Sequence, residues 1–194
     1  MHTPRWFFLS LLAALLLVAT PVLAQTHVHG IETDLPPVED QDQAYNLLIS
    51  AIDIIPNPEA MKDRWPDIVD RLSRTAEDRS LSRYERLRAT SFLGNYQEPA
   101  ARHALVRLTA DAEPRIRGLA YYALGLAFLD ADQEGSLLSH IIAGLEDPEE
   151  RVRHDVVRAL GYSRAPEAVE LLEHIVETGD ERIQRIAHRS LHYR

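Results

Sequence analysis

The sequence predicts an all-α fold, a right-handed α-solenoid of stacked helical hairpins, and three observations support this prediction. First, one helix-turn-helix pattern recurs; its clearest copy runs from Asp147 to Gly161 and continues in a second helix from Ala165 to Glu177. Second, shifting this copy by about 31 to 36 residues brings the same residue types into register, and such self-similarity is typical of repeat proteins. Third, prolines and Leu-Gly pairs stand where helices are expected to begin and end. The positions that we expect to form the stacking core are Ala89, Ala120, Val156 and Ala187 together with Leu93, Leu124, Leu160 and Leu191.

Residues 1–24 have the composition of a secretory signal peptide. Arg5 precedes an apolar run of about 13 residues, which is shorter than the roughly 20 that a membrane-spanning helix needs. We therefore expect cleavage before Gln25 rather than a retained anchor. Residues 25–40 contain prolines and acids without helical periodicity, which predicts a flexible linker, and residues 41–194 form the predicted repeat domain. The sequence has no cysteine, so neither a lipid-modified cysteine nor a disulfide can form.

The first helical hairpin is expected to differ from the others, as terminal repeats of solenoids often do. Its first helix is predicted over 42–55, with Pro56 as its stop. Asn57 is then expected to cap a helix whose first residue is proline, and Trp65-Pro66 should break that helix, leaving a main run over 66–76. The side chains predicted to face the core from the first helix are Leu47, Leu48, Ala51, Ile52 and Ile55.

The later helices are bounded by clearer signals. Ser82 and Glu85 have the spacing of a capping box, which should open a helix. Gly94, Gly125 and Gly161 each follow a leucine, so we expect them to close helices in the left-handed conformation. The predicted helices cover 82–93, 97–110, 114–128, 133–146, 148–160, 165–177 and 181–193. This gives four helical hairpins and one terminal helix.

The pattern Asp-x-x-x-x-[Ile/Val]-Arg-x-x-[Ala/Val]-x-x-Ala-Leu-Gly occurs from Asp111 to Gly125 and from Asp147 to Gly161. This pattern resembles the HEAT repeat, in particular the short bacterial form that also occurs in phycobilisome lyase-like proteins. The resemblance covers residues 80–194 well and 42–79 weakly. It implies that the Asp and Arg link neighbouring repeats, a structural role that falls on Asp111, Arg117, Asp147 and Arg153.

The outermost copies depart from this pattern. Ser80 and Thr178 stand where the Asp is expected, and Gln184 stands where the Arg is expected. We therefore expect the Asp-Arg ladder to be interrupted at both ends. Lyase chemistry is not implied, because no motif in the sequence supports it and the signal peptide directs the chain away from the cytosol.

The second helices of the hairpins share a polar position that could bind a partner. Arg71, Arg107, His140 and His174 occupy the same place between apolar residues, so stacking should set them in a row. HEAT-like proteins generally bind through the concave surface formed by these second helices, which would present the row to acidic or polar groups of a partner. The alternative is an exposed polar position that merely alternates with core positions.

Catalytic and metal-binding signals are weak. The sequence contains no nucleophile elbow, HExxH, phosphate loop or CxxC. His188 and His192 are four residues apart, which places both on one helix face within reach of one ion, but two histidines alone are a weak signal and a solvated helix face is the preferred interpretation. We expect no metal or other cofactor.

The predicted function is that of a non-enzymatic scaffold or adaptor in the bacterial cell envelope, most simply the periplasm, that binds a protein or peptide. The formal net charge is −9, and loss of residues 1–24 removes one further positive charge, Arg5. This balance argues against binding nucleic acid or an anionic membrane, since both require positive patches. The alternative is a metal-binding or catalytic envelope protein that uses histidines of the second and terminal helices, namely His140, His174, His188 and His192.

Overall fold

The computed structural model describes residues 40–192 except 53, 56 and 133. The predicted signal peptide and nearly all of the predicted linker lie outside the described residues. Within the described part the secondary structure is entirely helical. Its helices are too short or too polar to cross a membrane.

The described helices follow the predicted order closely from residue 83 onwards. Short 3-10 turns, η1 (Leu129–Ala131) and η2 (Gly144–Glu146), extend α6 and α7. The α-helices are α1 (Gln41–Ser50), α2 (Pro58–Arg64), α3 (Ile68–Glu77), α4 (Arg83–Leu93), α5 (Pro99–Leu108), α6 (Pro114–Phe128), α7 (Ser136–Ala143), α8 (Glu150–Leu160), α9 (Pro166–Thr178) and α10 (Glu181–His192).

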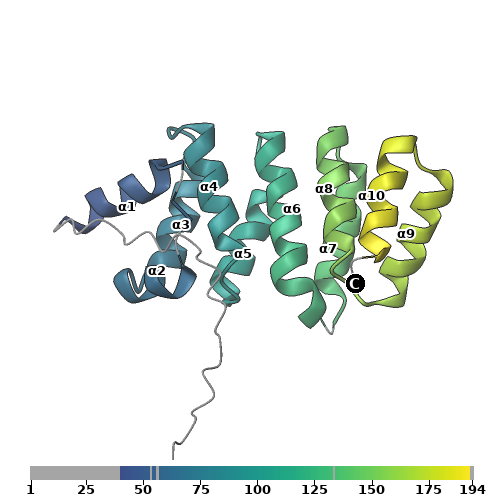
Figure 1. The fold of residues 1–194 in the computed structure, drawn as a ribbon, viewed down its shortest axis with the longest axis horizontal. Coiled ribbons are helices and arrows are strands. Elements are labelled where there is room, and N and C mark those ends of the chain that lie inside the picture. Colours follow the sequence, from purple (N-terminus) through teal and green to yellow (C-terminus); the bar gives the residue numbers. More distant parts are fainter. Residues whose placement is uncertain (1–39, 53, 56, 133, 193–194) are drawn as a thin grey trace, which may run out of the picture. The chain divides into compact units, whose positions relative to one another are not determined.

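The helices form two layers (Figure 1). Helices α4, α6, α8 and α10 pack in sequence against one another, and we call them the first-helix layer. Helices α3, α5, α7 and α9 each pack against the first helix that follows them, and we call them the second-helix layer. This arrangement is the predicted α-solenoid of helical hairpins with a terminal helix.

The stacking core lies where the repeat register predicted it. Ala89, Ala120, Val156 and Ala187 are all 0% exposed, and so are Leu93, Leu124 and Leu160. Leu191, near the end of α10, is only partly buried against this core. Burial of one equivalent small residue and one leucine per first helix therefore holds successive units together.

Gly94 and Gly161 close α4 and α8 where the sequence predicted helix ends, but neither has the predicted left-handed conformation, and Gly125 does not close a helix. Gly94 and Gly161 have right-handed φ angles of −65° and −61°, and Gly125 lies inside α6. They serve close packing instead: a Cβ atom on Gly125 would lie 2.7 Å from the backbone of Ala159 on α8, and one on Gly161 would lie 2.8 Å from Cβ of Ser190 on α10. Each glycine thus permits the next first helix to approach.

The first helix of the chain ends earlier than predicted, at Ser50 rather than near 55. The early end of α1 leaves backbone carbonyl groups without helical partners, and side chains from α4 bind them. The hydroxyl of Tyr84 donates to the oxygen of Ala51 at 2.7 Å. Arg88 donates to the oxygens of Leu48 and Ile54. These bonds replace the missing helical turn.

The predicted apolar face of this helix was also wrong in part. Leu47 is 44% exposed and Ile52 is 80% exposed. The helix is turned so that Tyr45 lies inside, where its hydroxyl is 2.8 Å from that of Thr75 and its ring meets Trp65 edge-on. The side chains that α1 buries are Ala44, Tyr45, Leu48 and Ile49.

The other local predictions for this region are confirmed. Asn57 caps α2 by accepting from the backbone N–H of Glu59 at 2.8 Å, and the chain breaks at Trp65 before α3 begins. Ser82 and Glu85 form the predicted capping box at the start of α4.

Candidate functional site

Arginines of the first-helix layer reach across to the loop of the next unit. Arg117 on α6 donates to both carboxylate oxygens of Asp147, with Nε and Nη2 at 2.8 and 2.9 Å. These bonds hold the pKa of Asp147 below its ordinary value. Arg86 on α4 donates to Asp111 at 2.5 Å, and both of these side chains are more than nine-tenths buried. The two pairs join three successive units.

The same aspartates also shape their own loops. Asp111 and Asp147 accept from the backbone N–H two residues later, at 2.8 and 2.9 Å. Arg153, the next arginine along, donates to the backbone oxygen of Asp147 at 2.7 Å and so fastens the loop before its own helix.

The loops at both ends of the repeat domain do contain an aspartate equivalent to Asp111 and Asp147. It is Asp78 at one end and Asp180 at the other, whereas the sequence pattern placed Ser80 and Thr178 at this position. Asp78 accepts from the backbone N–H of Ser80 at 2.9 Å, and Asp180 accepts from that of Arg182 at 2.9 Å. The equivalent acid was missed because its spacing to the first helix differs between loops. Hydrogen bonds from the hydroxyl and the backbone N–H of Ser80 lower the pKa of Asp78. Those from the backbone N–H groups of Ile183 and Arg182 lower the pKa of Asp180, and Arg153 lowers it further.

The predicted row on the second helices is largely engaged within the protein. Arg71 on α3 pairs with Asp42 at 2.6 Å and with Asp67 at 2.9 Å. Arg107 on α5 pairs with Glu77 of the preceding unit at 2.7 Å. These guanidinium groups bridge helices rather than standing free for a partner.

The two histidines of the row differ from each other. His140 on α7 is half-buried, its Nε2 lies 3.0 Å from the Thr109 hydroxyl of the preceding unit, and burial lowers its pKa. This ring therefore stays neutral to a lower pH than an exposed histidine would. His174 on α9 is exposed, and the structure shows no side-chain partner for it among the described residues. The row thus contains one freely presented side chain.

The terminal histidines form a pair on α10. The rings of His188 and His192 stack with centroids 4.3 Å apart, and Nδ1 of His192 donates to the backbone oxygen of His188 at 2.9 Å. Within the described residues, no cluster brings together three or more side chains of the kinds that bind metal ions.

The outer surface of the first-helix layer carries a second repeated pattern, which sequence reasoning missed. The register that aligns the core also aligns Arg115, Arg151 and Arg182, and it aligns Tyr122, Arg158 and Arg189. Comparing the exposed positions of the first helices, as was done for the second helices, would have revealed both sets. We call the surface formed by these side chains and by Leu119, Asp155, Tyr162 and Ile186 the first-helix face.

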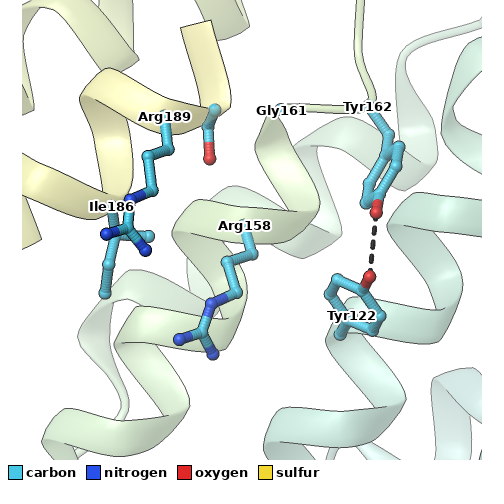
Figure 2. A pocket seen from close by; sticks show the side chains of 7 residues that line it. Tyr122, Arg158, Gly161, Tyr162, Ile186 and Arg189 are labelled. Atoms are coloured by element: carbon cyan, nitrogen blue, oxygen red, sulfur yellow. Dashed lines mark hydrogen bonds between the residues drawn. The ribbon is translucent and has the colours of Figure 1, made fainter. Parts of the chain in front are cut away.

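Two adjoining hollows mark the first-helix face. One, of about 220 Å³, lies between α6, α8 and α10 and is lined by Tyr122, Arg158, Gly161, Tyr162, Ile186, Arg189 and Ser190 (Figure 2). The other, of about 370 Å³, extends over α4, α6 and α8 and is lined by Leu87, Arg115, Leu119, Tyr122, Arg151, Asp155 and Arg158. Tyr122 and Arg158 line both, so the hollows adjoin, and we call the two together the groove.

A tyrosine pair forms one wall of this groove. The hydroxyls of Tyr122 and Tyr162 lie 2.9 Å apart and their rings meet at 70°. Burial, with the hydrogen bond from Tyr122, raises the pKa of Tyr162 to about 12, so it stays a neutral phenol at any physiological pH. Figure 2 shows this pair beside Arg158, with Arg189 and Ile186 on the neighbouring helix.

The arginines of the groove are mostly unpaired. Arg115, Arg151 and Arg189 make no ion pair or side-chain hydrogen bond with any described residue. Arg158 pairs at 2.5 Å with Asp155, which is the only acid among the described residues that line the two hollows. The groove therefore combines excess positive charge with aromatic and aliphatic side chains.

Comparison with known proteins identifies the repeat type. Residues 138–192 match the family model for HEAT repeats. The described fold is similar to a solved structure of human deoxyhypusine hydroxylase in complex with glycerol, with a TM-score of 0.51 and 25% sequence identity over 63% of this chain and 42% of that chain. This chain thus spans less than half the length of that enzyme. No curated protein matches the sequence. Together with the recurring Asp-Arg contacts, these findings support a HEAT-repeat family for this chain and show an α-solenoid fold.

Proposed function

We propose that this chain is a non-enzymatic scaffold of the bacterial cell envelope, exported to the periplasm, that binds a protein partner on its first-helix face. HEAT repeats generally mediate protein–protein interaction. The observation that carries the choice of surface is the set of unpaired arginines beside a tyrosine pair on adjoining helices. Tyrosine and arginine are the residue types most enriched at protein interfaces.

The packing of the first-helix layer supports this role because it fixes the helices that carry the arginines before a partner arrives. Gly125 and Gly161 bring the backbones of α6, α8 and α10 close together, and the Arg117–Asp147 pair holds consecutive units in register. The backbone of a surface fixed in this way loses little conformational entropy when it binds. Rigid stacking and a charged face together fit a scaffold.

A photo-crosslinking experiment in cells tests which face binds. A photoreactive amino acid replaces Leu126, which is 51% exposed one turn beyond Tyr122, and in a matched variant it replaces His174, which is exposed on α9. We expect a protein crosslink from position 126 that is weak or absent from position 174. A crosslink from position 174 alone would indicate that the partner binds the row on the second helices. If no crosslink formed from either position, the scaffold function would be wrong.

Export is tested separately. Fractionation of cells that make the full-length chain should place it in the periplasmic fraction, and mass spectrometry of that protein should give an N-terminus at Gln25. A chain that retains residues 1–24 in the membrane fraction would contradict the proposed cleavage and release.

A further inference from the structure

The groove on the first-helix face has a charge opposite to that of the whole chain. The chain carries a net charge of −9, yet the described residues that line the two hollows include four arginines, Arg115, Arg151, Arg158 and Arg189, and a single acid, Asp155. Asp155 compensates only one of these four charges, that of Arg158, to which it binds while its carboxylate packs over Gly118 and is 13% exposed. The groove is thus a local site for negative charge.

The spacing of the arginines follows from the packing of the helices. Arg115 and Arg151 occupy the same repeat position on α6 and α8, and Arg158 and Arg189 share another on α8 and α10. Packed helices lie about 8–10 Å apart. An extended peptide advances about 3.3 Å per residue, so a strand that crosses these helices meets a new guanidinium about every three residues.

Apolar side chains lie between the charges. Leu119 and Tyr122 stand on α6 in the groove, and Ile186 stands on α10 beside Arg189. A ligand with only negative charge would leave these side chains uncovered. One with apolar or aromatic residues between its acids would cover them and would desolvate the ion pairs, which strengthens them.

We propose that the first-helix face binds an extended acidic peptide segment of a partner protein, with carboxylates about three residues apart and an apolar or aromatic residue between them. The carboxylates pair with Arg151 and Arg115 in one hollow and with Arg158 and Arg189 in the other. The intervening side chain packs on Tyr122 and Ile186. This inference rests on the proposed scaffold function and names the chemistry of its partner.

A peptide fits better than a polyanion. Long nucleic acids and anionic membranes would meet the net negative charge of the rest of the chain, which opposes their approach at low salt. A short segment confined to the groove meets only the local positive charge. The tyrosine and aliphatic walls also match side chains that a peptide supplies.

Fluorescence anisotropy with synthetic peptides tests the proposal. The probe is a labelled peptide of repeated Glu-Leu-Ala-Glu-Tyr-Ala, and its control has the same composition with the glutamates adjacent. The protein is the mature chain from Gln25, in low salt and in salt raised to about 0.3 M, which screens exposed charges. We expect saturable binding of the spaced peptide, weaker binding of the clustered one, and loss of binding in high salt.

Matched charge-reversal variants locate the site. Arg151→Glu with Arg189→Glu should weaken binding of the spaced peptide by about tenfold or more, since two attractive pairs become repulsive. Arg74→Glu with Arg79→Glu changes the net charge equally at exposed positions outside the groove and should leave binding within about twofold. Helical content and the unfolding midpoint, measured for both, show that each variant folds.

Four results would overturn the proposal. They are absence of saturable binding, equal weakening by both variant pairs, equal binding of both peptides, and tighter binding of duplex DNA or phosphatidylglycerol vesicles than of the spaced peptide. If the crosslink from position 126 forms but the spaced peptide does not bind, the scaffold function stands and the acidic chemistry fails. Absence of both would remove the function itself.

Discussion

The two helix layers use most of their exposed arginines in different ways, although Arg182 on α10 of the first-helix layer does pair with Glu150 on α8 at 3.7 Å. In the second-helix layer, Arg71 and Arg107 each bind an acid from another helix of the stack, so the exposed charge helps to join helices. In the first-helix layer, Arg115, Arg151 and Arg189 have no such partner among the described residues. A row of equivalent charged side chains on a solenoid is therefore not by itself evidence for a binding site, because such side chains can instead form ion pairs that join neighbouring helices.

The packing of each layer explains part of this difference. Small residues such as Gly125 and Ala159 bring the first helices together, and equivalent outward side chains then stand side by side. Arg115 and Arg151 are equivalent and alike in charge, so they cannot stabilise each other. An arrangement that gives the folded chain no internal advantage is better explained by an external ligand.

The largest expected effect concerns the buried ladder beneath both faces. Asp111→Ala should lower the free energy of unfolding by about 3–5 kcal/mol, because it leaves the buried Arg86 without its counter-ion. Urea denaturation followed by circular dichroism measures the change. Glu77→Ala, which removes the partner of the exposed Arg107, is the matched control and should cost at most about 1 kcal/mol. Equal losses would show that the ladder contributes no more than a surface ion pair.

The next largest effect tests the repeat register in the first-helix layer. Leu124→Ala should cost about 2–5 kcal/mol, because this leucine is fully buried and its loss leaves a cavity between units. Leu126→Ala on the same helix removes the same atoms from a side chain that is 51% exposed, and should cost at most about 0.5 kcal/mol. Chemical denaturation of both variants measures the two values. A similar loss for both would contradict the burial pattern.

Sequence periodicity was sufficient to predict the solenoid and most of its core. Ala120, Val156 and Leu124 could be assigned because each lies in a clear copy of the repeat and packs against an equivalent neighbour. The register failed where the chain lacks a clear copy. The end of α1 depends on Tyr84 and Arg88, which are distant in sequence and supply hydrogen bonds that no local pattern reveals.

The candidate sites were harder to predict because their roles depend on partners from other helices. From the sequence, Arg107 and Arg151 are both expected to be exposed arginines on helices. Only the structure distinguishes them, because Glu77 lies close enough to pair with Arg107 and no described acid pairs with Arg151. The role of Gly125 was misassigned for a similar reason. Its position after leucine is typical of a helix end, whereas the approach of Ala159 from the next unit accounts for the glycine.

A pH experiment probes the interior of the first-helix layer. His154 on α8 is 3% exposed, its Nε2 has no hydrogen-bond partner among the described residues although Glu150 lies 3.3 Å away, and burial lowers its pKa below 6.5. Glu150 and Asp180 favour the charged ring, while Arg182 and Arg158 oppose it. The unfolded state therefore binds more protons than the folded state below about pH 6.5, and the free energy of unfolding falls as pH falls through this range.

The variant His154→Gln should show a smaller fall in the free energy of unfolding between about pH 7.5 and 5.5, because it removes one of the groups that cause it. His174→Gln removes an exposed histidine instead and is the matched control. Carboxylates with lowered pKa, such as Asp147, lose their contribution only at lower pH, so they do not mask the effect. An unchanged slope in His154→Gln would show that this ring does not limit stability in acid.

The smallest expected change in stability gives the most direct comparison of the arginines in the two layers. A double-mutant cycle on Arg107 and Glu77 should give a coupling free energy of about 0.2–1 kcal/mol, as exposed ion pairs do, and added salt should reduce it. Arg151→Ala should change the free energy of unfolding by at most about 0.5 kcal/mol, because no ion pair is lost. The same variant should reduce the crosslink formed from position 126, whereas Arg107→Ala should leave that crosslink unchanged. If Arg107→Ala reduced the crosslink while Arg151→Ala did not, the second helices would be the binding layer and the free arginines of the first helices would be only a solvated surface.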